Sequence, residues 1–375
     1  MFKKIIQFSH NDLDGYGCNV VTRVVSKLLE DRGLKISIEN HNCDYDSIDE
    51  IIKNSFRMVF DHEFDETLFI VSDISWKSNE VTELLKGVKY FVYADHHRSA
   101  EPLAQEMGKY DTKAGRISMC VEGGWCGTAR LLDCLETLCY ECGYNIKETQ
   151  NDFDTIDRLE DFVNIVNNWD LWLWANDPKV KEMRSALNLL NQTPAKLNAF
   201  LDFFSQSLIG NDVHLFADYM VDLITHPIEA TFEKDLSRLF SDTNNFSDYI
   251  SRQAVQIEIS CRQYQRVQLP MPSGPDIEAI CFRISTGLRQ KSLVSMLAHN
   301  KTEGIKDFDC IMIYEQGSDR ISLRYPKDDL DLSFVAKYNE LASDNTGGGH
   351  PNAAGFPVNP NDFDKILMKK KIRYV

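Results

Sequence analysis

Five short segments of the chain carry metal-binding side chains at places where a strand is expected to end. They are His10-Asn11-Asp12-Leu13-Asp14-Gly15, Asp73, Asp95-His96-His97, Asp170 and Gly347-Gly348-Gly349-His350. Carboxylates and imidazoles are ligands that Mn²⁺ and Mg²⁺ accept, and a pair of such ions can promote hydrolysis of a phosphate ester. Together the five segments predict a two-metal site for phosphate chemistry.

The first segment places His10, Asp12 and Asp14 at alternate positions just after an expected strand. Alternate side chains of extended backbone point the same way, which suits two metal ions about 3.5 to 4 Å apart. The alternative is an acidic turn that caps the next helix, because Asp and Gly favour turns and helix N-termini. Asp73, which follows an apolar strand, has the same alternative as a helix cap.

The triplet Asp95-His96-His97 follows another apolar strand, and an acid beside two histidines is rare in a purely structural setting. One imidazole can bind a metal ion while the next meets the substrate, and the acid can fix the tautomer of an imidazole. Asp170 lies in a tryptophan-rich helix, where a surface carboxylate beside core tryptophans is the alternative.

The glycine run at 347–350 combines an amide-rich loop with an expected helix start at Pro351. Backbone amides in such a loop are suited to cradling phosphate. A plain flexible loop is the alternative, although His350 and the run Asn352-Ala353-Ala354-Gly355-Phe356 favour a packed, functional loop.

The elements that must position these residues follow an α/β pattern. Apolar strands alternate with amphipathic stretches over residues 1–100, which predicts a doubly wound, mostly parallel sheet. The expected strands are 4–8, 35–39, 68–71 and 90–93, with a helix at 17–29. Ligand sites in such sheets lie outside the carboxyl ends of the strands, so the acidic and imidazole side chains should converge.

A second, smaller α/β domain is expected after a helical region. Helices are expected to open at Gly127 and to cover 159–174, and the stretch 196–260 to be a helical connector. The later elements are a strand at 277–284, a helix at 288–299, a hairpin of 309–314 with 320–324, and a helix at 332–341. The expected domains are therefore 1–195, 196–260 and 261–375.

Composition narrows the possible partners. The chain has 375 residues and a formal net charge of -16, which favours two domains and opposes a protein that coats long nucleic acid. We find no signal-peptide pattern and no run that could span a membrane, so we expect a cytoplasmic protein. The ten cysteines fit free thiols in a reducing compartment, and none lies in the five segments.

At these residues the chain resembles the DHH phosphoesterase superfamily, in the two-domain branch that carries a DHHA1 domain. That branch includes the RecJ exonucleases, the nano-RNases and phosphodiesterases of cyclic dinucleotides and their linear products. The resemblance covers most of the chain, with five motifs in the family's order. It implies a catalytic DHH domain at 1–195, a DHHA1 substrate-binding domain at 261–375, and an active site in the cleft between them.

The resemblance also implies roles for individual residues. One Mn²⁺ would be held by His10, Asp12 and Asp73, and the other by Asp14, Asp73, His96 and Asp170. His97 would face the scissile phosphate, with Asp95 as its supporting acid and a bridging hydroxide as the attacking group. Substrate would be bound by Arg324 and by Gly347, Gly348, Gly349 and His350. Tyr325 stands where this branch usually has a serine.

The expected function is removal of mononucleotides from very short oligonucleotides, above all linear dinucleotides such as pGpG or pApA. The cofactors would be two Mn²⁺ ions, with Mg²⁺ or Co²⁺ as substitutes, and related enzymes are often homodimers. The alternatives are a cyclic-dinucleotide phosphodiesterase, a RecJ-like single-strand exonuclease, an inorganic pyrophosphatase and a nucleotide-binding regulator on a degenerate scaffold.

Several residues of the second domain are candidates for contact with a base or a phosphate. Phe282, Tyr314 and Tyr325 could stack on a base, although core packing is the commoner role for such residues. Arg289 and Lys291 could meet substrate phosphates or simply begin a solvated helix.

Overall fold

The computed structural model divides the chain into two compact units, each made of two stretches of sequence. Unit 1 consists of Met1–Trp174 and Phe203–Thr243, and unit 2 of Ala175–Asp202 and Asn244–Val375. The connector expected at 196–260 therefore contributes to both units. The described residues are 2–59, 63–97, 100–108, 117–121, 124–206, 214–285, 288, 290–302, 304–327, 330–342, 347–350 and 352–375.

Unit 1 contains a five-stranded sheet in the order β2-β1-β3-β4-β5, and every neighbouring pair in it is parallel. Its strands are β1 Lys4–His10, β2 Ser37–Cys43, β3 Thr67–Ser72, β4 Tyr90–Asp95 and β5 Ile117–Val121. The prediction of a parallel sheet in an α/β fold is confirmed, and β5 is a strand that the sequence pattern did not reveal.

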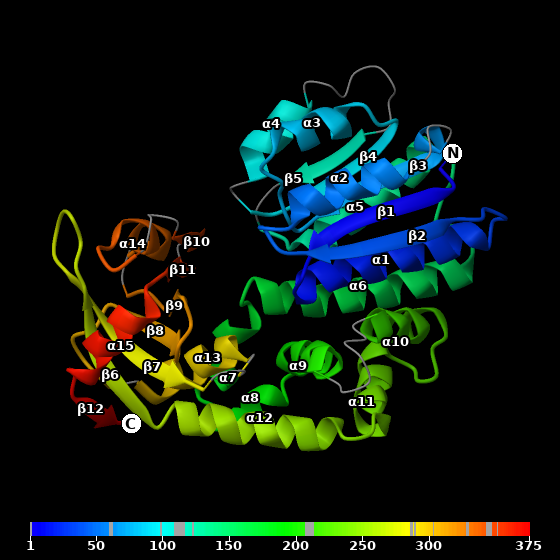
Figure 1. Cartoon of the computed structure of the whole chain (residues 1–375). Coiled ribbons are helices and arrows are strands. Elements are labelled where there is room, and N and C mark those ends of the chain that lie inside the picture. Colours follow the sequence, from blue (N-terminus) through cyan, green and yellow to red (C-terminus); the bar gives the residue numbers. More distant parts are fainter. Residues whose placement is uncertain are drawn as a thin grey trace. The chain divides into compact units, whose positions relative to one another are not determined.

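Helices cover both faces of this sheet. On one face the apolar side chains of β1, β3 and β4 pack with α2 Ile48–Met58, α3 Asn79–Lys86 and α4 Glu101–Gly108. The other face is covered by α1 Leu13–Glu30 and α5 Gly127–Glu141, and α6 Gln150–Asp170 packs on both of these helices (Figure 1). Two further helices complete this layer: α10 His214–Thr225 packs against α1 and α6, and α11 Phe232–Asp242 packs against α6 and α10.

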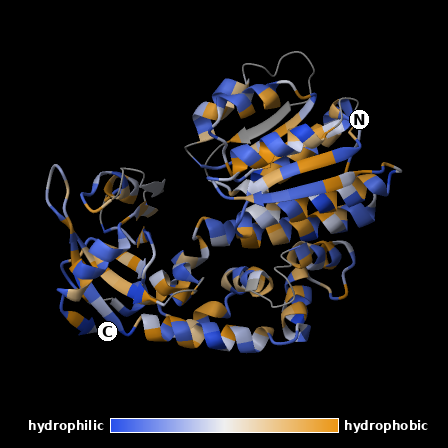
Figure 2. Ribbon diagram, viewed as in Figure 1, coloured by the Kyte–Doolittle hydropathy of each residue, from blue (hydrophilic) through white to orange (hydrophobic). Residues whose placement is uncertain are grey.

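Burial explains the composition of the strands. Every residue of β3 and β4 is buried, because helices cover these central strands on both sides, and their sequences are continuous apolar runs. The edge strand β2 is half-exposed and largely hydrophilic (Figure 2).

The strand order creates a natural ligand position. The chain runs from β1 outward to β2 and then returns to place β3 on the other side of β1. The loops that leave β1 and β3 therefore diverge at the carboxyl end of the sheet, where ligands bind in open α/β sheets. His10 ends β1 and Asp73 directly follows β3, so both lie at this position.

Unit 2 contains a seven-stranded mixed sheet in the order β10-β11-β9-β8-β7-β6-β12, in which β7 and β8 are parallel. Its strands are β6 Gln263–Leu269, β7 Ile277–Ile284, β8 Cys310–Glu315, β9 Arg320–Arg324, β10 Gly348–His350, β11 Ala353–Pro357 and β12 Ile372–Tyr374. Apolar residues of α14 Leu332–Tyr338 and α15 Pro360–Met368 fill one face of the sheet. The predicted strand at 277–284 and the predicted hairpin of β8 with β9 are confirmed.

The remaining helices lie outside this core. They are α7 Pro178–Lys181, α8 Ala186–Leu190, α9 Thr193–Gln206, α12 Phe246–Ser260 and α13 Lys291–Thr302. Among the residues that the structure describes, none of the helices combines the length and apolar character needed to cross a membrane.

Candidate metal centre

The turn from β1 into α1 brings three of the predicted ligands together. Helix α1 begins at Leu13 rather than at the expected residue 17, so Asp12 is its N-cap and Asp14 lies in its first turn. The expectation of one extended segment with alternating ligands is therefore wrong. The Asp12 carboxylate accepts from the Gly15 amide at 3.1 Å and lies 2.7 Å from His10 Nδ1. Asp12 both caps α1 and contacts His10, so the role of this segment as a helix cap does not exclude its role as a source of metal ligands.

Glycine at position 15 is required by this turn. A Cβ atom there would lie 1.9 Å from the carbonyl oxygen of His10, which is far inside van der Waals contact. The side chains of His10 and Asp12 can approach each other because the backbone of α1 passes this close to the end of β1.

Asp14 is held by the N-terminus of another helix. Its two carboxylate oxygens accept from the backbone amides of Gly127 at 2.6 Å and Thr128 at 2.8 Å, at the start of α5. The Thr128 hydroxyl donates to the backbone oxygen of Asp14 at 2.7 Å. A Cβ at position 127 would lie 2.7 Å from Cβ of Asp73, so only glycine lets α5 come this close. The positive end of the α5 dipole also favours a carboxylate at this place.

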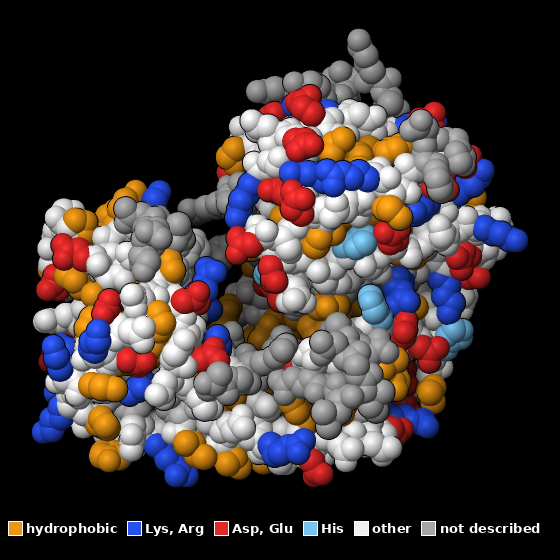
Figure 3. Space-filling model, viewed as in Figure 1, with side chains coloured by type: hydrophobic (Ala, Val, Ile, Leu, Met, Phe, Trp, Pro, Cys, Tyr) orange, Lys and Arg blue, Asp and Glu red, His pale blue; other side chains and the backbone are white. Residues whose placement is uncertain are grey.

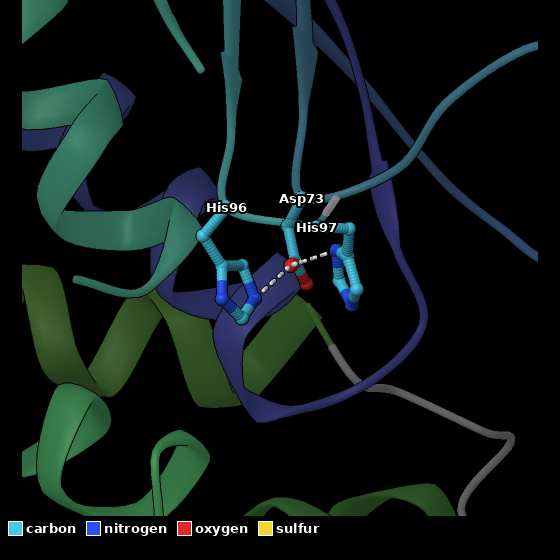
Figure 4. Close-up of side chains that lie close together, drawn as sticks. All are labelled: Asp73, His96 and His97. Carbon is cyan, nitrogen blue, oxygen red and sulfur yellow. Dashed lines mark ion pairs between the residues drawn. The ribbon is translucent and has the colours of Figure 1, made fainter. Parts of the chain in front are cut away.

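Asp73 lies at the middle of the cluster. It is 1% exposed and adopts a left-handed φ of 56° directly after β3. Its Oδ1 atom lies 3.3 Å from His96 Nε2 and 3.9 Å from His97 Nδ1, between the two imidazoles (Figure 4). Its Oδ2 atom lies 3.8 Å from His10 Nδ1. Neither oxygen accepts a hydrogen bond from any described residue.

Asp95 supports the two histidines that follow it. One carboxylate oxygen accepts from the amides of His96 at 2.7 Å and His97 at 3.0 Å, and lies 2.8 Å from His97 Nδ1. The other oxygen accepts from the hydroxyl of Ser75 at 3.1 Å. This arrangement fixes the ring of His97, so its Nε2 atom faces away from Asp95.

His96 joins Asp170 to the cluster. Its Nε2 atom lies 3.3 Å from Asp170 Oδ2 and 3.7 Å from Asp14 Oδ2. Asp170 is the last residue of α6 rather than an interior residue of the expected helix 159–174. The end of α6 thus supplies a ligand-type side chain from a region far from the strands in sequence.

Three overlapping sets of side chains are close enough to hold metal ions. In each set the ligand atoms lie within 4.8 Å of one another: Asp73, His96 and His97; His10, Asp12 and Asp73; Asp14, His96 and Asp170. The donors are hard oxygens and imidazole nitrogens, which suit Mn²⁺ or Mg²⁺ better than a thiolate site would. Both oxygens of Asp73 and one of Asp170 are buried without a hydrogen-bond donor among the described residues. Divalent cations fit this donor set, because they would satisfy those oxygens.

The electrostatics of the carboxylates agree with a cation site. Burial, followed by the charges of Asp14 and Asp12, raises the pKa of Asp73 well above its ordinary value. The pKa of Asp170 is raised for the same reasons. Without a cation, these carboxylates repel each other in a space that water solvates poorly.

The pKa values of the three histidines are shifted in different directions. Burial and the neighbouring His97 lower the pKa of His96, which favours the neutral form that binds metal. Burial alone would lower the pKa of His97, but its hydrogen bond with Asp95 outweighs burial and raises it. The pKa of His10 is raised because Asp12 outweighs burial in the same way.

The residues predicted to bind substrate lie in unit 2. Arg324 ends β9, and its guanidinium donates to the carbonyl oxygens of Leu323 at 2.7 Å and Ala354 at 3.3 Å. Arg324 and Gly348 line one hollow of about 380 Å³ over the sheet.

The glycine run forms strand β10, which pairs with β11, and it does not lead into a helix. The helix start expected after the glycine run is therefore wrong, because residues 353–357 form β11, while Pro351 itself lies outside the described residues. A Cβ at Gly347 would lie 1.9 Å from the Ala336 carbonyl oxygen, and one at Gly349 would lie 2.6 Å from that of Ala353. These two glycines are needed for packing. The side chain of His350 lies outside the described residues.

The remaining predictions in unit 2 have mixed outcomes. Phe282 and Tyr314 are fully buried, which confirms the core role given as the commoner one. Tyr325 stacks on His299 at 4.1 Å. Lys291 pairs with Glu315 at 2.8 Å, whereas Arg289 lies outside the described residues.

The chain was compared with known proteins. No protein-family model matches it, and no curated protein matches it. One solved structure, described as an uncharacterized protein from Helicobacter pylori G27, aligns over 97% of this chain and 97% of its own, at 19% sequence identity and a TM-score of 0.39. A likeness at this level carries no conclusion about activity.

The structure also shows residues around His10 that the sequence did not indicate as part of the site. The ring of Tyr45 lies 5.3 Å from that of His10, and burial and nearby carboxylates raise its pKa. A chain of buried and partly buried hydrogen bonds runs from Ser9 through Asn19 to Asn42, which donates to the backbone oxygen of His10 at 2.9 Å. Ser9 follows an apolar stretch of β1 and Asn19 lies on the buried side of α1, and these polar side chains in apolar surroundings were the available signal.

Proposed function

We propose that the chain is a metal-dependent phosphodiesterase of the DHH and DHHA1 type that hydrolyses very short oligonucleotides. Its preferred substrates would be linear dinucleotides such as pGpG or pApA, which it would convert to mononucleotides. The observation that carries the proposal is Asp73, whose two buried oxygens accept no hydrogen bond from a described residue and face ligand-type side chains of two different sets.

The acidic and histidine residues described above would hold two cations. One cation would be held by His10, Asp12 and Asp73, and the other by Asp14, Asp73, His96 and Asp170. Cations held there, Mn²⁺ or in its place Mg²⁺ or Co²⁺, supply the charge that stabilises a phosphoryl group during in-line displacement.

His97 is the residue best prepared to meet the phosphate. Its Nδ1 atom lies 2.8 Å from the Asp95 carboxylate, which orients the ring so that Nε2 points away from Asp95 and could donate a hydrogen bond to a phosphate oxygen or a proton to the leaving oxygen. Its raised pKa favours the protonated ring, which is the form that can donate.

Charge supports a short substrate. The net charge of -16 opposes binding along a polyanion, because such binding needs many phosphate contacts. On the face drawn in Figure 3, Lys and Arg side chains are scattered among Asp and Glu side chains. Arg324, in the hollow of unit 2, could hold a terminal phosphate, since a guanidinium suits a phosphate oxygen pair.

The test is a substrate panel with Mn²⁺: pNpN dinucleotides, a ten-nucleotide RNA, cyclic dinucleotides and pyrophosphate. We expect the dinucleotides to be hydrolysed best, and we expect chelation or Asp73→Ala to remove activity. Asp161→Asn, which removes an exposed carboxylate from α6, is the matched control and should keep full activity. Preference for the ten-nucleotide RNA, cyclic dinucleotides or pyrophosphate would replace the proposed substrate, and activity in Asp73→Ala would reject the metal assignment.

A further inference from the structure

Three tryptophan rings form a compact group beside the metal centre. The ring centroids of Trp169 and Trp172 are 6.3 Å apart, those of Trp169 and Trp174 are 5.6 Å apart, and those of Trp172 and Trp174 are 6.5 Å apart. The interplanar angles are only 17° to 21°. Because the three separations are nearly equal and the planes nearly parallel, the rings form a triangle that shares one orientation.

The backbone places this group directly at a predicted metal ligand. Trp169 precedes Asp170, whose Oδ2 atom lies 3.3 Å from His96 Nε2. Leu171 is the C-cap of α6, and the amide of Trp172 then donates to the Trp169 carbonyl at 3.1 Å. Trp169 and Trp172 therefore lie one residue before and two residues after Asp170, on the chain that leaves the cluster.

Trp172 adopts a conformation that a bulky residue rarely takes. It has a left-handed φ of 59°, at the position after the C-cap where glycine is the usual residue. Within the described part of unit 1, Trp172 and Asp73 are the non-glycine residues with positive φ. Strained backbone of this kind persists where the surroundings hold it, and it gathers at functional sites. Of the two examples in unit 1, Asp73 belongs to this centre and Trp172 lies two residues after Asp170.

Burial distinguishes the group from an ordinary aromatic core. The aromatic residues that fill the sheet core, such as Phe8 and Phe69, are fully buried. Trp174 is 8% exposed, whereas Trp169 and Trp172 are only half-buried. The indole N–H of Trp174 is buried and donates to no acceptor in the part of the chain that the structure describes. Core packing therefore accounts for Trp174, whereas Trp169 and Trp172 each keep part of their surface in contact with solvent.

We propose that Trp169 and Trp172 stack on a nucleobase of the substrate and so select phosphodiesters that carry an aromatic base. This inference rests on the proposed phosphodiesterase function and names the part of the substrate that the site recognises. Stacking tolerates every base, because each base has a π face, so it selects a nucleotide over an abasic ester without selecting one base. The two tryptophans are specificity residues, while the reaction is performed elsewhere in the centre.

The first experiment compares two diesters in the full-length protein with Mn²⁺: a linear dinucleotide, and the same diester with an abasic ribose in place of one nucleoside. Trp172→Leu should raise KM for the dinucleotide roughly 10- to 100-fold, the range expected for losing one stacked base. KM for the abasic diester and kcat for both should change less than about threefold. Trp172→Phe should recover part of the loss, because it restores an aromatic ring.

A matched control removes a different aromatic ring from unit 1. Tyr140 is 77% exposed near the end of α5, so it lies about 20 Å along that helix from the residues that hold Asp14. Tyr140→Leu should leave both KM values unchanged. An equal loss on both diesters in Trp172→Leu would mean that the tryptophans only position Asp170. Unchanged KM for the dinucleotide would mean that they only pack the chain. Either result overturns the proposal.

A second measurement needs neither a variant nor turnover. Three of the five tryptophans of the chain belong to this group, so base stacking should quench the intrinsic fluorescence. A 5′-mononucleotide should quench the wild-type protein, and ribose 5-phosphate should not. Absence of quenching by the mononucleotide overturns the stacking proposal even if dinucleotides are hydrolysed. Quenching without hydrolysis of any diester would reject the phosphodiesterase and keep the base-binding group.

Discussion

Replacing Asp73 by asparagine should stabilise the metal-free protein while it abolishes catalysis. The ligand atoms of Asp12 and Asp73 lie within 4.8 Å of each other, and two like charges at that separation repel by about 3.5 kcal/mol at an effective dielectric constant near 20. Protonated His10 beside Asp12 offsets part of this repulsion. We therefore expect asparagine to raise the free energy of unfolding by about 2 kcal/mol, or roughly 4 to 8 °C for a unit of this size. The new amide group would donate to the surrounding carboxylates, so it would not be left unpaired.

The predicted difference in stability between the variant and the wild type should also depend on pH, in a direction that can be measured. The folded protein raises the pKa of Asp73, so it binds a proton that the unfolded chain has already released above about pH 4. The stability of the metal-free wild type should consequently fall as the pH rises from about 4, whereas asparagine does not titrate. The difference in Tm between variant and wild type should be near zero below that pH and should widen above it.

Thermal unfolding in EDTA, followed by circular dichroism over a pH series, measures this difference. Asp161→Asn is the control, because it removes an exposed carboxylate and should not reproduce the effect. Added Mn²⁺ should reverse the order, since only the wild type gains the full binding free energy. A variant that is less stable than the wild type at every pH in EDTA would refute the electrostatic account of the cluster.

Three further changes test other parts of unit 1. Gly15→Ala places a methyl group against the end of β1 and should lower the free energy of unfolding by about 3 kcal/mol in urea titrations; a neutral effect would contradict the tight turn. Thr128→Val removes the hydroxyl that donates to the backbone of Asp14 and should weaken Mn²⁺ binding roughly 10-fold by calorimetry, with unchanged affinity as the contrary result. Arg158→Ala leaves Asp235 buried without its ion-pair partner and should cost about 3 to 5 kcal/mol by chemical denaturation, whereas a loss under 1 kcal/mol would show that water replaces the arginine.

The sequence was sufficient for the central strands of the sheet in unit 1, because buried parallel strands are continuous apolar runs. It was also sufficient to group His10, Asp12, Asp73 and His96, since residues at the carboxyl ends of parallel strands must meet at one edge. In the central strands, one short pattern therefore predicted both the buried strand and the position of the site residue that follows it. The edge strand β2 and the unexpected β5 show that the outer strands of the sheet are harder to recognise in the sequence than the central ones.

Other features depended on contacts that no local pattern contains. The amides that hold Asp14 belong to the start of α5, more than a hundred residues later, and nothing in Gly127-Thr128 itself names that partner. The helix expected after the glycine run is absent because residues 353–357 pair as β11 with β10 and with β9, a contact that the glycine run itself does not indicate. The fate of the apolar helices between 196 and 260 could not be predicted either, because amphipathic periodicity shows that a face is buried but not which core buries it.

The division of the chain has a consequence for its synthesis. Unit 1 is interrupted after Trp174 and resumes at Phe203, so α10 and α11 reach it only after another unit has begun to emerge. Arg158 in α6 has its partner, Asp235, in that late segment. Translation of residues 175–243 takes roughly 3 to 14 s at 5 to 20 residues per second. During that interval the nascent chain exposes a buried arginine and one side of α1 and α6. An amino-terminal fragment that stops at residue 174 would keep this unfinished surface permanently, which makes it a natural substrate for chaperones.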